Sequence, residues 1–159
     1  MKKNLVAYFS RTGEQYGVGN ITEGNTAILA QMNAKKADAD VFEIKVIDDK
    51  YPNTYSELVQ FAKEEKRQNA RPDIEGDLPI DENYENIFLG YPNWWSDMPM
   101  PVYTFIEKYG FQDRNIYHFC THEGSGGVYR DGFALFGHIA QNNREEAEKK
   151  IDEWLARIL

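Results

Sequence analysis

A short apolar segment runs directly into a loop of hydroxyl and glycine residues near the start of the chain, and this order restricts the fold more than any other feature. Residues 5–9 (LVAYF) predict a buried strand, residues 10–13 (SRTG) follow at once, and residues 24–26 (GNT) open a helix-like run. Strand, polar loop and helix N-terminus together form an anion site, because free backbone amides and the helix dipole point at the anion. The loop has no lysine, which excludes the nucleoside-triphosphate loop. We therefore expect a small phosphorylated cofactor held by neutral donors.

Strands and helices alternate along the rest of the chain. Strands are predicted at 4–9, 41–47, 87–90, 116–121 and 133–136, helices at 25–36, 54–68, 101–109 and 143–159, and a loop at 70–83. Polar and apolar residues alternate in 41–47, which predicts a half-exposed strand at a sheet edge. The expected helix caps are Asn25 or Thr26 for the first helix and Asn142 or Asn143 for the last. The alternation predicts an α/β fold with a mainly parallel sheet.

The length and charge of the chain limit its organisation and its partners. A chain of 159 residues fits a single domain over 1–159. The net charge of -8 argues against nucleic acid and anionic membranes and fits a basic protein partner, although it can also serve solubility alone. The apolar segment of five residues near the N-terminus is too short for a signal peptide, and no apolar run approaches the roughly 20 residues of a membrane span. We expect a soluble cytoplasmic protein.

The single cysteine, Cys120, excludes a disulfide framework within one chain and a cysteine metal cluster. It lies in an apolar segment, which favours a small core residue over a redox thiol. We expect no metal site.

Three loops follow the predicted strands at the edge where open parallel sheets bind ligands. The first is the hydroxyl loop, the second (91–97) carries Trp94 and Trp95, and the third (122–127) is rich in glycine. Together they predict a site for a flat aromatic cofactor with a phosphate tail, since stacking on a large ring contributes about 1 kcal/mol beyond burial. The alternatives are that both tryptophans pack on the helix near Pro101 and that the glycine loop is a plain turn. His122 and Glu123 could bond ring edges. His122 could also donate a proton, but we assign no catalytic residue because a lone histidine is more often structural.

The chain resembles the flavodoxin family at four motifs that occur in the correct order. They are residues 8–13 (YFSRTG), 24–26 (GNT), 90–95 (GYPNWW) and 121–126 (THEGSG). The resemblance covers nearly the whole chain and implies a doubly wound parallel sheet with strand order 2-1-3-4-5 and bound FMN. The expected cofactor-binding residues are Ser10, Arg11, Thr12, Gly24, Asn25, Thr26, Pro92, Asn93, Trp94, Trp95, Thr121, His122, Glu123, Gly124, Ser125 and Gly126. The resemblance gives the phosphate to Ser10, Thr12, Asn25 and Thr26, and the ring to 92–95 and 121–126. Residues 14–23 separate the two halves of the phosphate loop, as similar insertions do in some members.

One departure from the family concerns the segment 128–141. Members of the family usually have a helix between the fourth and fifth strands, but here the candidate strand 133–136 follows Gly127 within a few residues. A parallel return needs about a dozen residues. Residues 128–131 extend about 13 Å, less than the roughly 17–20 Å of a typical strand. We expect this helix to be missing or very short and the fifth strand to be shifted, antiparallel, detached or supplied by another protomer. A homodimer could cover the sheet face left open.

The leading functional hypothesis is an FMN-binding redox protein that transfers electrons at low potential to a basic redox partner. Small size, acidity and the absence of a second nucleotide motif favour this carrier over an NAD(P)H-dependent FMN quinone or nitro-compound reductase. The tryptophan loop and the many aromatic residues favour the reductase, with a small quinone-type substrate. A flavin-less interaction module is an alternative of another class. A receiver domain is disfavoured because Ser10 and Arg11 stand where an acidic cluster is needed. A Rossmann dehydrogenase is disfavoured because no Gly-x-Gly-x-x-Gly run follows the first strand.

Overall fold

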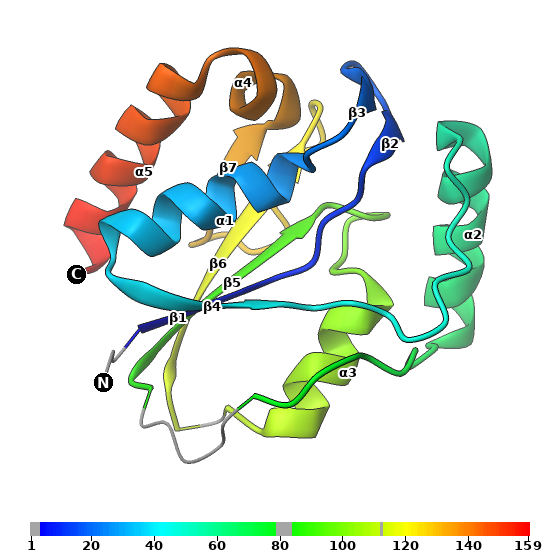
Figure 1. Cartoon of the computed structure of the whole chain (residues 1–159), viewed down its shortest axis with the longest axis horizontal. Helices are drawn as coiled ribbons and strands as arrows, with labels where there is room; N and C mark the ends of the chain where they lie inside the picture. Colours follow the sequence, from blue (N-terminus) through cyan, green and yellow to red (C-terminus); the bar gives the residue numbers. More distant parts are fainter. Residues whose placement is uncertain (1–3, 79–83, 112) are drawn as a thin grey trace.

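A computed structural model describes residues 4–78, 84–111 and 113–159 of the chain. The strands are β1 (Asn4–Tyr8), β2 (Gly13–Gln15), β3 (Gly19–Ile21), β4 (Ala39–Glu43), β5 (Asn86–Pro92), β6 (Asn115–His122) and β7 (Phe133–Phe136). The helices are α1 (Asn25–Lys36), α2 (Tyr55–Gln68), α3 (Met100–Tyr109), α4 (Gly137–Asn142) and α5 (Arg144–Ile158) (Figure 1). Every predicted strand and helix is present. The hairpin β2–β3 and the short helix α4 were not predicted.

Five parallel strands form the main sheet in the order β4-β1-β5-β6-β7. Counting only these strands along the chain, the order is 2-1-3-4-5, so the predicted doubly wound sheet is confirmed. The strand predicted at 41–47 lies at the sheet edge as expected, but β4 begins at Ala39 and ends at Glu43. Val46 makes only an isolated bridge with Ile74 in the predicted 70–83 loop. Residues 79–83 of that loop lie outside the described residues.

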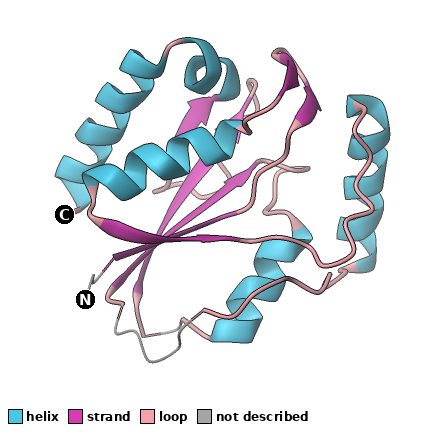
Figure 2. Ribbon diagram, viewed as in Figure 1, coloured by secondary structure: helices cyan, strands magenta, loops and turns pink. Residues whose placement is uncertain are grey.

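The sheet is covered on both faces because neighbouring side chains of each strand point to opposite sides. Leu5 and Ala7 of β1 face α3, whereas Val6 and Tyr8 face α1 and α5. Figures 1 and 2 show α1, α4 and α5 on one face and α3 on the other. Helix α2 stands beyond the carboxyl ends of the strands, next to the β2–β3 hairpin. This position makes α2 a wall beside the loops that follow the strands.

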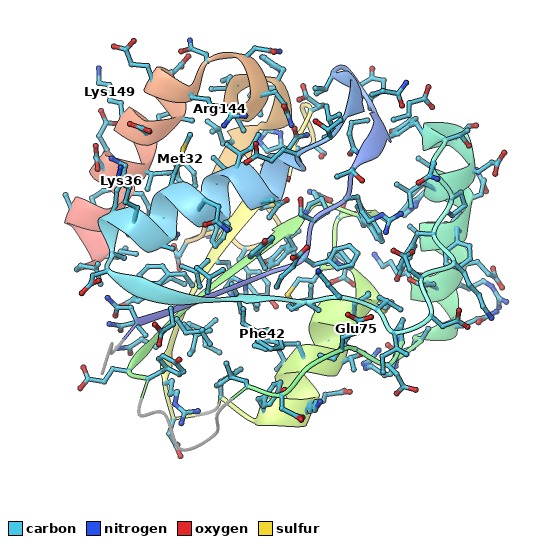
Figure 3. All side chains as sticks on the ribbon, viewed as in Figure 1. Met32, Lys36, Phe42, Glu75, Arg144 and Lys149 are labelled. Atoms are coloured by element: carbon cyan, nitrogen blue, oxygen red, sulfur yellow. The ribbon has the colours of Figure 1, made fainter. Side chains whose placement is uncertain are left out.

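Aromatic contacts hold the two outer helices against the sheet. Trp154 of α5 packs edge-on against Phe88, with ring centroids 5.9 Å apart. On the other face, Phe42 of β4, which is labelled in Figure 3, stacks on Phe105 of α3, with ring centroids 5.5 Å apart. Helix α5 begins as predicted, because the Asn143 side chain accepts a hydrogen bond from the backbone of its first turn. No helix within the described ranges is both long enough and apolar enough to cross a membrane.

The connection from β6 to β7 resolves the problem of the missing helix. Residues 123–132, all of them described, contain no helix, as predicted. Strand β7 is parallel to β6 and pairs only with its second half, Phe119 opposite Phe133 and His122 opposite Phe136. The chain therefore returns by about three residues, roughly 10 Å, instead of a full strand length. The expectations of an antiparallel, detached or exchanged strand were wrong. A short strand shifted toward the carboxyl end of the sheet needs no helical crossover.

The same connection covers part of the sheet face that the helix would have covered. The Tyr129 ring stacks on the His118 imidazole of β6, with centroids 3.9 Å apart and planes inclined by 16°. The Tyr91 hydroxyl and His118 Nδ1 share a hydrogen bond of 2.8 Å. Burial under Tyr129 and against Tyr91 lowers the pKa of His118 to about 4. His118 is therefore a neutral part of the packing.

We expect His118 to make the protein less stable in mild acid. The unfolded chain takes up this proton near pH 6.5 and the folded chain only near its pKa of about 4. The contribution of His118 to the free energy of unfolding is therefore fully present above about pH 6.5. It decreases as the pH falls toward 4, by at most about 3 kcal/mol. Urea unfolding at several pH values, compared with His118→Gln, measures the effect. An equal pH slope in the two proteins would contradict it.

A second expectation concerns Gly90 in the buried middle of the sheet. A Cβ at Gly90 would lie 2.1 Å from the Phe119 ring, so Gly90→Ala forces this ring to move. We expect the free energy of unfolding to fall by about 2 kcal/mol, as for other overpacked cores. In a Phe119→Leu background the same substitution should cost clearly less, because the ring is gone. Equal costs in the two backgrounds, measured by urea unfolding, would show that the ring is not the cause.

Candidate functional site

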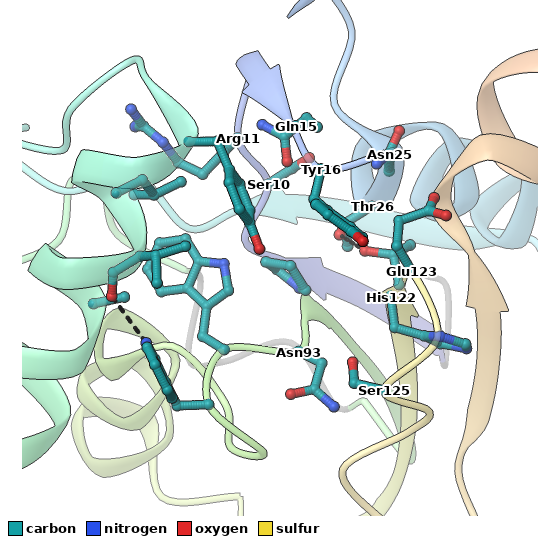
Figure 4. Close-up of a pocket in the computed structure, with 18 of the residues that line it drawn as sticks. Ser10, Arg11, Gln15, Tyr16, Asn25, Thr26, Asn93, His122, Glu123 and Ser125 are labelled. Carbon is teal, nitrogen blue, oxygen red and sulfur yellow. Dashed lines mark hydrogen bonds between the residues drawn. The ribbon is translucent and has the colours of Figure 1, made fainter. Parts of the chain in front are cut away.

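A cavity of about 380 Å³ opens at the carboxyl ends of β1, β5 and β6, where the three predicted loops meet (Figure 4). Twelve of the expected cofactor-binding residues line it: Ser10, Arg11, Asn25, Thr26, Pro92, Asn93, Trp94, Trp95, Thr121, His122, Glu123 and Ser125. Four of the expected residues, Thr12, Gly24, Gly124 and Gly126, are not among those lining it. Residues that sequence reasoning did not assign are Gln15, Tyr16, Tyr55, Leu58, Val59, Ala62 and Ser96. The structure thus brings the predicted loops together and adds a wall from α2 and the hairpin.

The hydroxyl loop and the N-terminus of α1 form the polar end of the cavity. Ser10 Oγ accepts a hydrogen bond of 3.1 Å from the backbone N–H of Ala27, so a side chain from the β1 loop caps the helix. The N-cap position belongs to Gly24, which offers no side chain. The prediction of Asn25 or Thr26 as the cap was therefore wrong. Glycine is required here because a Cβ at Gly24 would lie only 2.0 Å from Ser10 Oγ.

The polar end presents mainly neutral groups. Thr26 Oγ1 and Thr121 Oγ1 share a hydrogen bond of 2.8 Å, which ties α1 to the end of β6. The Arg11 guanidinium instead pairs with Asp49 and lies 5.1 Å over the Tyr51 ring. Its charge is thereby engaged outside the polar end. The hydroxyls and the free amides of the first helical turn remain as the donors suited to a phosphate.

The amide of Asn25 gives a further sign that this end is built for a ligand. Within the described part of the chain, Asn25 Oδ1 is buried without a hydrogen-bond partner. A buried polar atom without a partner costs free energy, so a group from an occupant is the simplest way to satisfy it.

The two tryptophans of the β5–α3 loop form the aromatic end. Trp94 packs edge-on against Phe9, with ring centroids 5.3 Å apart. Trp95 is 42% exposed, and its Nε1 donates a hydrogen bond of 2.9 Å to the Val59 carbonyl of α2. These two contacts are with Phe9, which directly follows β1, and with α2, and neither is with the helix near Pro101 that the alternative named.

Asn93 fixes the geometry of this loop and joins it to the glycine-rich loop. Its Oδ1 accepts from the Ser96 backbone N–H at 2.9 Å, and its Nδ2 donates to the Gly126 carbonyl at 2.8 Å. Trp95 and Ser96 both have positive φ angles, 57° and 61°. Such angles are rare outside glycine and persist where surrounding contacts hold the turn. Asn93 therefore holds both loops in one arrangement beside the cavity.

The glycine-rich loop depends on its glycines for its shape. Gly124 and Gly126 have φ angles of 110° and 80°, which other residues rarely adopt. His122 Nδ1 accepts a hydrogen bond of 3.0 Å from the Gly124 backbone N–H. Burial lowers the pKa of His122 and the Glu123 carboxylate acts in the opposite direction. The neutral ring accepts at Nδ1, so its hydrogen is on Nε2 and can be donated.

Helix α2 supplies the part of the wall that sequence reasoning missed. Its apolar stripe (Tyr55, Leu58, Val59, Ala62) was correctly predicted as one face of a helix, but a stripe of this kind also reads as ordinary core. The structure places α2 beyond the carboxyl ends of the strands (Figure 1), and in this position its apolar stripe lines the cavity.

Cys120 and the possibility of a metal site remain to be considered. Cys120 is buried, and burial raises the pKa of its thiol to about 12, which agrees with the predicted core residue and disfavours a reactive thiolate. Among residues 4–78, 84–111 and 113–159, no group of three His, Cys, Asp or Glu side chains is placed to hold a metal ion.

Comparison with known proteins gives the class to which this fold and cavity belong. A family model described as flavodoxin matches residues 3–135, so the chain belongs to the flavodoxin family. A solved structure of a protein from Bacteroides eggerthii that is described as a flavoprotein has a TM-score of 0.73 at 24% identity, covering 99% of this chain and 98% of that one. A counterpart from Bacteroides uniformis has a TM-score of 0.72 at 25% identity, with coverages of 95% and 98%. A flavoprotein from Lactobacillus acidophilus, solved in complex with FMN, has a TM-score of 0.64 at 19% identity, with coverages of 97% and 99%. No curated protein matches the chain.

The capping role of Ser10 can be tested without any ligand. Ser10→Ala removes the acceptor for the Ala27 N–H, and we expect the free energy of unfolding to fall by about 1 kcal/mol, as for other lost helix caps. The matched control is Thr12→Ala, because Thr12 is exposed and outside the cavity lining. It should change stability by less than about 0.5 kcal/mol. Thermal or urea unfolding measures both, and equal losses would contradict the assigned role.

Proposed function

We propose that the chain binds FMN in this cavity and acts as an electron carrier. The observation that supports it best is the chemical division of one cavity, with neutral hydroxyls and helix amides at one end and Trp94 and Trp95 at the other. A flat ring with a phosphate tail needs these two environments at one site. Membership of the flavodoxin family supports the same cofactor.

The residues present fit this cofactor in both parts. Ser10, Asn25 and Thr26, with the first amides of α1, would hold the phosphate. Asn25 Oδ1, which has no hydrogen-bond partner, would accept a hydrogen bond from a hydroxyl of the sugar-alcohol chain. Trp94 and the loop from His122 to Ser125 would lie beside the ring system. Bound FMN supplies one- and two-electron redox chemistry. The protein contributes binding, orientation and exclusion of water.

The charge of the chain favours a low potential and a basic partner. The net charge is -8, and the Glu123 carboxylate, only 15% exposed, lines the cavity itself. Negative surroundings disfavour a further negative charge on a reduced cofactor, by the same reasoning that applies to pKa values. They also attract a positively charged redox protein and increase its association rate.

The cofactor proposal is tested by titrating purified protein with FMN. We expect quenching of free-flavin fluorescence at one FMN per chain, and binding at least about tenfold weaker for riboflavin, which lacks the phosphate. Ser10→Ala should weaken FMN binding more than riboflavin binding, while Ser56→Ala, at an exposed serine of α2 that does not line the cavity, serves as the control. Absence of any bound yellow chromophore after reconstitution would refute the proposal and favour a flavin-less interaction module.

The carrier is distinguished from a reductase by turnover without a partner. We expect the FMN-loaded protein to oxidise NADPH or NADH very slowly with a small quinone as the acceptor, because an electron carrier receives its electrons from another protein. Addition of a flavin reductase should then restore electron flow. Rapid NAD(P)H-dependent quinone or nitro-compound reduction by the protein alone would establish the reductase alternative instead.

A further inference from the structure

The β2–β3 hairpin (residues 13–21) crosses beside the cavity and is attached to the protein on both sides. We call it the strap. It leaves the hydroxyl loop after Thr12 and rejoins the chain just before α1 (Figure 1). Its Gln15 and Tyr16 side chains line the cavity.

On one side the strap is docked on the N-terminus of α2. The Glu14 N–H donates a hydrogen bond of 3.1 Å to the Asn53 carbonyl. Glu14 Oε1 accepts one of 2.6 Å from the Tyr55 N–H in the first turn of α2. Thr54, the N-cap residue of that helix, makes no capping bond of its own, so Glu14 takes over this role. The Tyr16 and Tyr55 rings lie 5.5 Å apart and are inclined by 33°.

On the other side the strap approaches the glycine-rich loop. A Cβ at Gly17 would lie 3.3 Å from Glu123 Oε2, which shows how close the turn comes to this side chain. Glu123 is itself held by His138, whose backbone N–H and Nδ1 lie 2.6 and 2.7 Å from its two oxygens. The strap therefore spans the space between α2 and the β6–β7 loop, as Figure 4 shows for Tyr16 and Glu123.

The strap is held by few internal contacts and carries a large exposed ring. Strands β2 and β3 pair over only three residues each, and an isolated hairpin of this size is marginally stable in water. Tyr16 is 60% exposed although it lines the cavity. An occupant beneath Tyr16 would bury more of this ring, so that binding and closure of the strap stabilise each other.

We propose that the strap closes over the bound cofactor and that the Tyr16 ring determines how fast the cofactor leaves and which solutes reach it. This rests on the proposed function, since it requires an occupant in the cavity. A ring over the cofactor restricts face-to-face approach by a small planar molecule. It leaves electron transfer through the exposed edge available to a protein partner.

The decisive measurement is the rate of FMN release. It is followed by the return of free-flavin fluorescence after the FMN-loaded protein is diluted far below its dissociation constant. We expect Tyr16→Ala to release FMN at least about tenfold faster, and Tyr16→Phe to resemble the unaltered protein because it keeps the ring. Quenching of residual bound-flavin fluorescence by iodide should increase in Tyr16→Ala only. Ile47→Ala is the control, because Ile47 is a large apolar residue as exposed as Tyr16 (60%) that does not line the cavity.

A second variant tests whether the strap acts as a unit. Glu14→Ala removes the acceptor for the Tyr55 N–H, and we expect faster FMN release together with faster hydrogen exchange in residues 13–21. Glu14→Gln keeps an acceptor oxygen and should have a smaller effect. In the unaltered protein, FMN should slow hydrogen exchange in this segment.

The outcomes separate this inference from the proposed function. If the unaltered protein fails to bind FMN, the proposed function fails first. If it binds FMN but Tyr16→Ala and Ile47→Ala release it at the same rate, the covering role of Tyr16 is refuted. Equal acceleration in Tyr16→Phe and Tyr16→Ala would likewise overturn it, because the ring would then not be the active feature.

Discussion

The parallel pairing of β1, β5 and β6 is the constraint on which the rest of the structure depends. Tyr8 of β1 stands opposite Gly90 of β5, and Gly90 stands opposite Phe119 of β6. This register ends the three strands at one edge, so the loops that follow them meet around one cavity. It also brings the Phe119 ring across Gly90, where only a hydrogen fits. Packing in the middle of the sheet and assembly of the site therefore rest on the same hydrogen-bonded ladder.

The cavity is built by cross-connections between loops that are distant in sequence. Ser10 caps α1 across the insertion, Asn93 joins the tryptophan loop to the glycine-rich loop, and Thr26 is bonded to Thr121. Each connection satisfies a polar group that would otherwise be left without a partner at the sheet edge. The same bonds position donors for a ligand, so stability and binding share these residues.

The β6–β7 connection shows how a family fold accommodates a lost helix. Strand β7 is short and pairs only with the second half of β6, so the chain needs to return only a short way. Tyr129 covers His118 where a helix would have packed. The substitute leaves Phe136 39% exposed on the sheet edge, so cover of this face is incomplete. The cost falls on the periphery of the sheet and leaves the three site-forming strands unchanged.

The sequence by itself determined the alternation of elements and the three site-forming loops, because apolar periodicity and loop composition are local signals. The strand order was implied by the resemblance of four motifs to the flavodoxin family. The sequence also indicated the missing helix, because the segment between Gly127 and the candidate strand 133–136 is too short for the helix that members of the family usually have there. Only the tertiary structure decided that β7 is shifted and parallel, that Ser10 caps α1, and that α2 and Tyr16 form a wall of the cavity. These features depend on which distant groups meet. A three-residue strand such as β2 or β3 is too short to show a period, and an apolar helical stripe does not reveal what it faces.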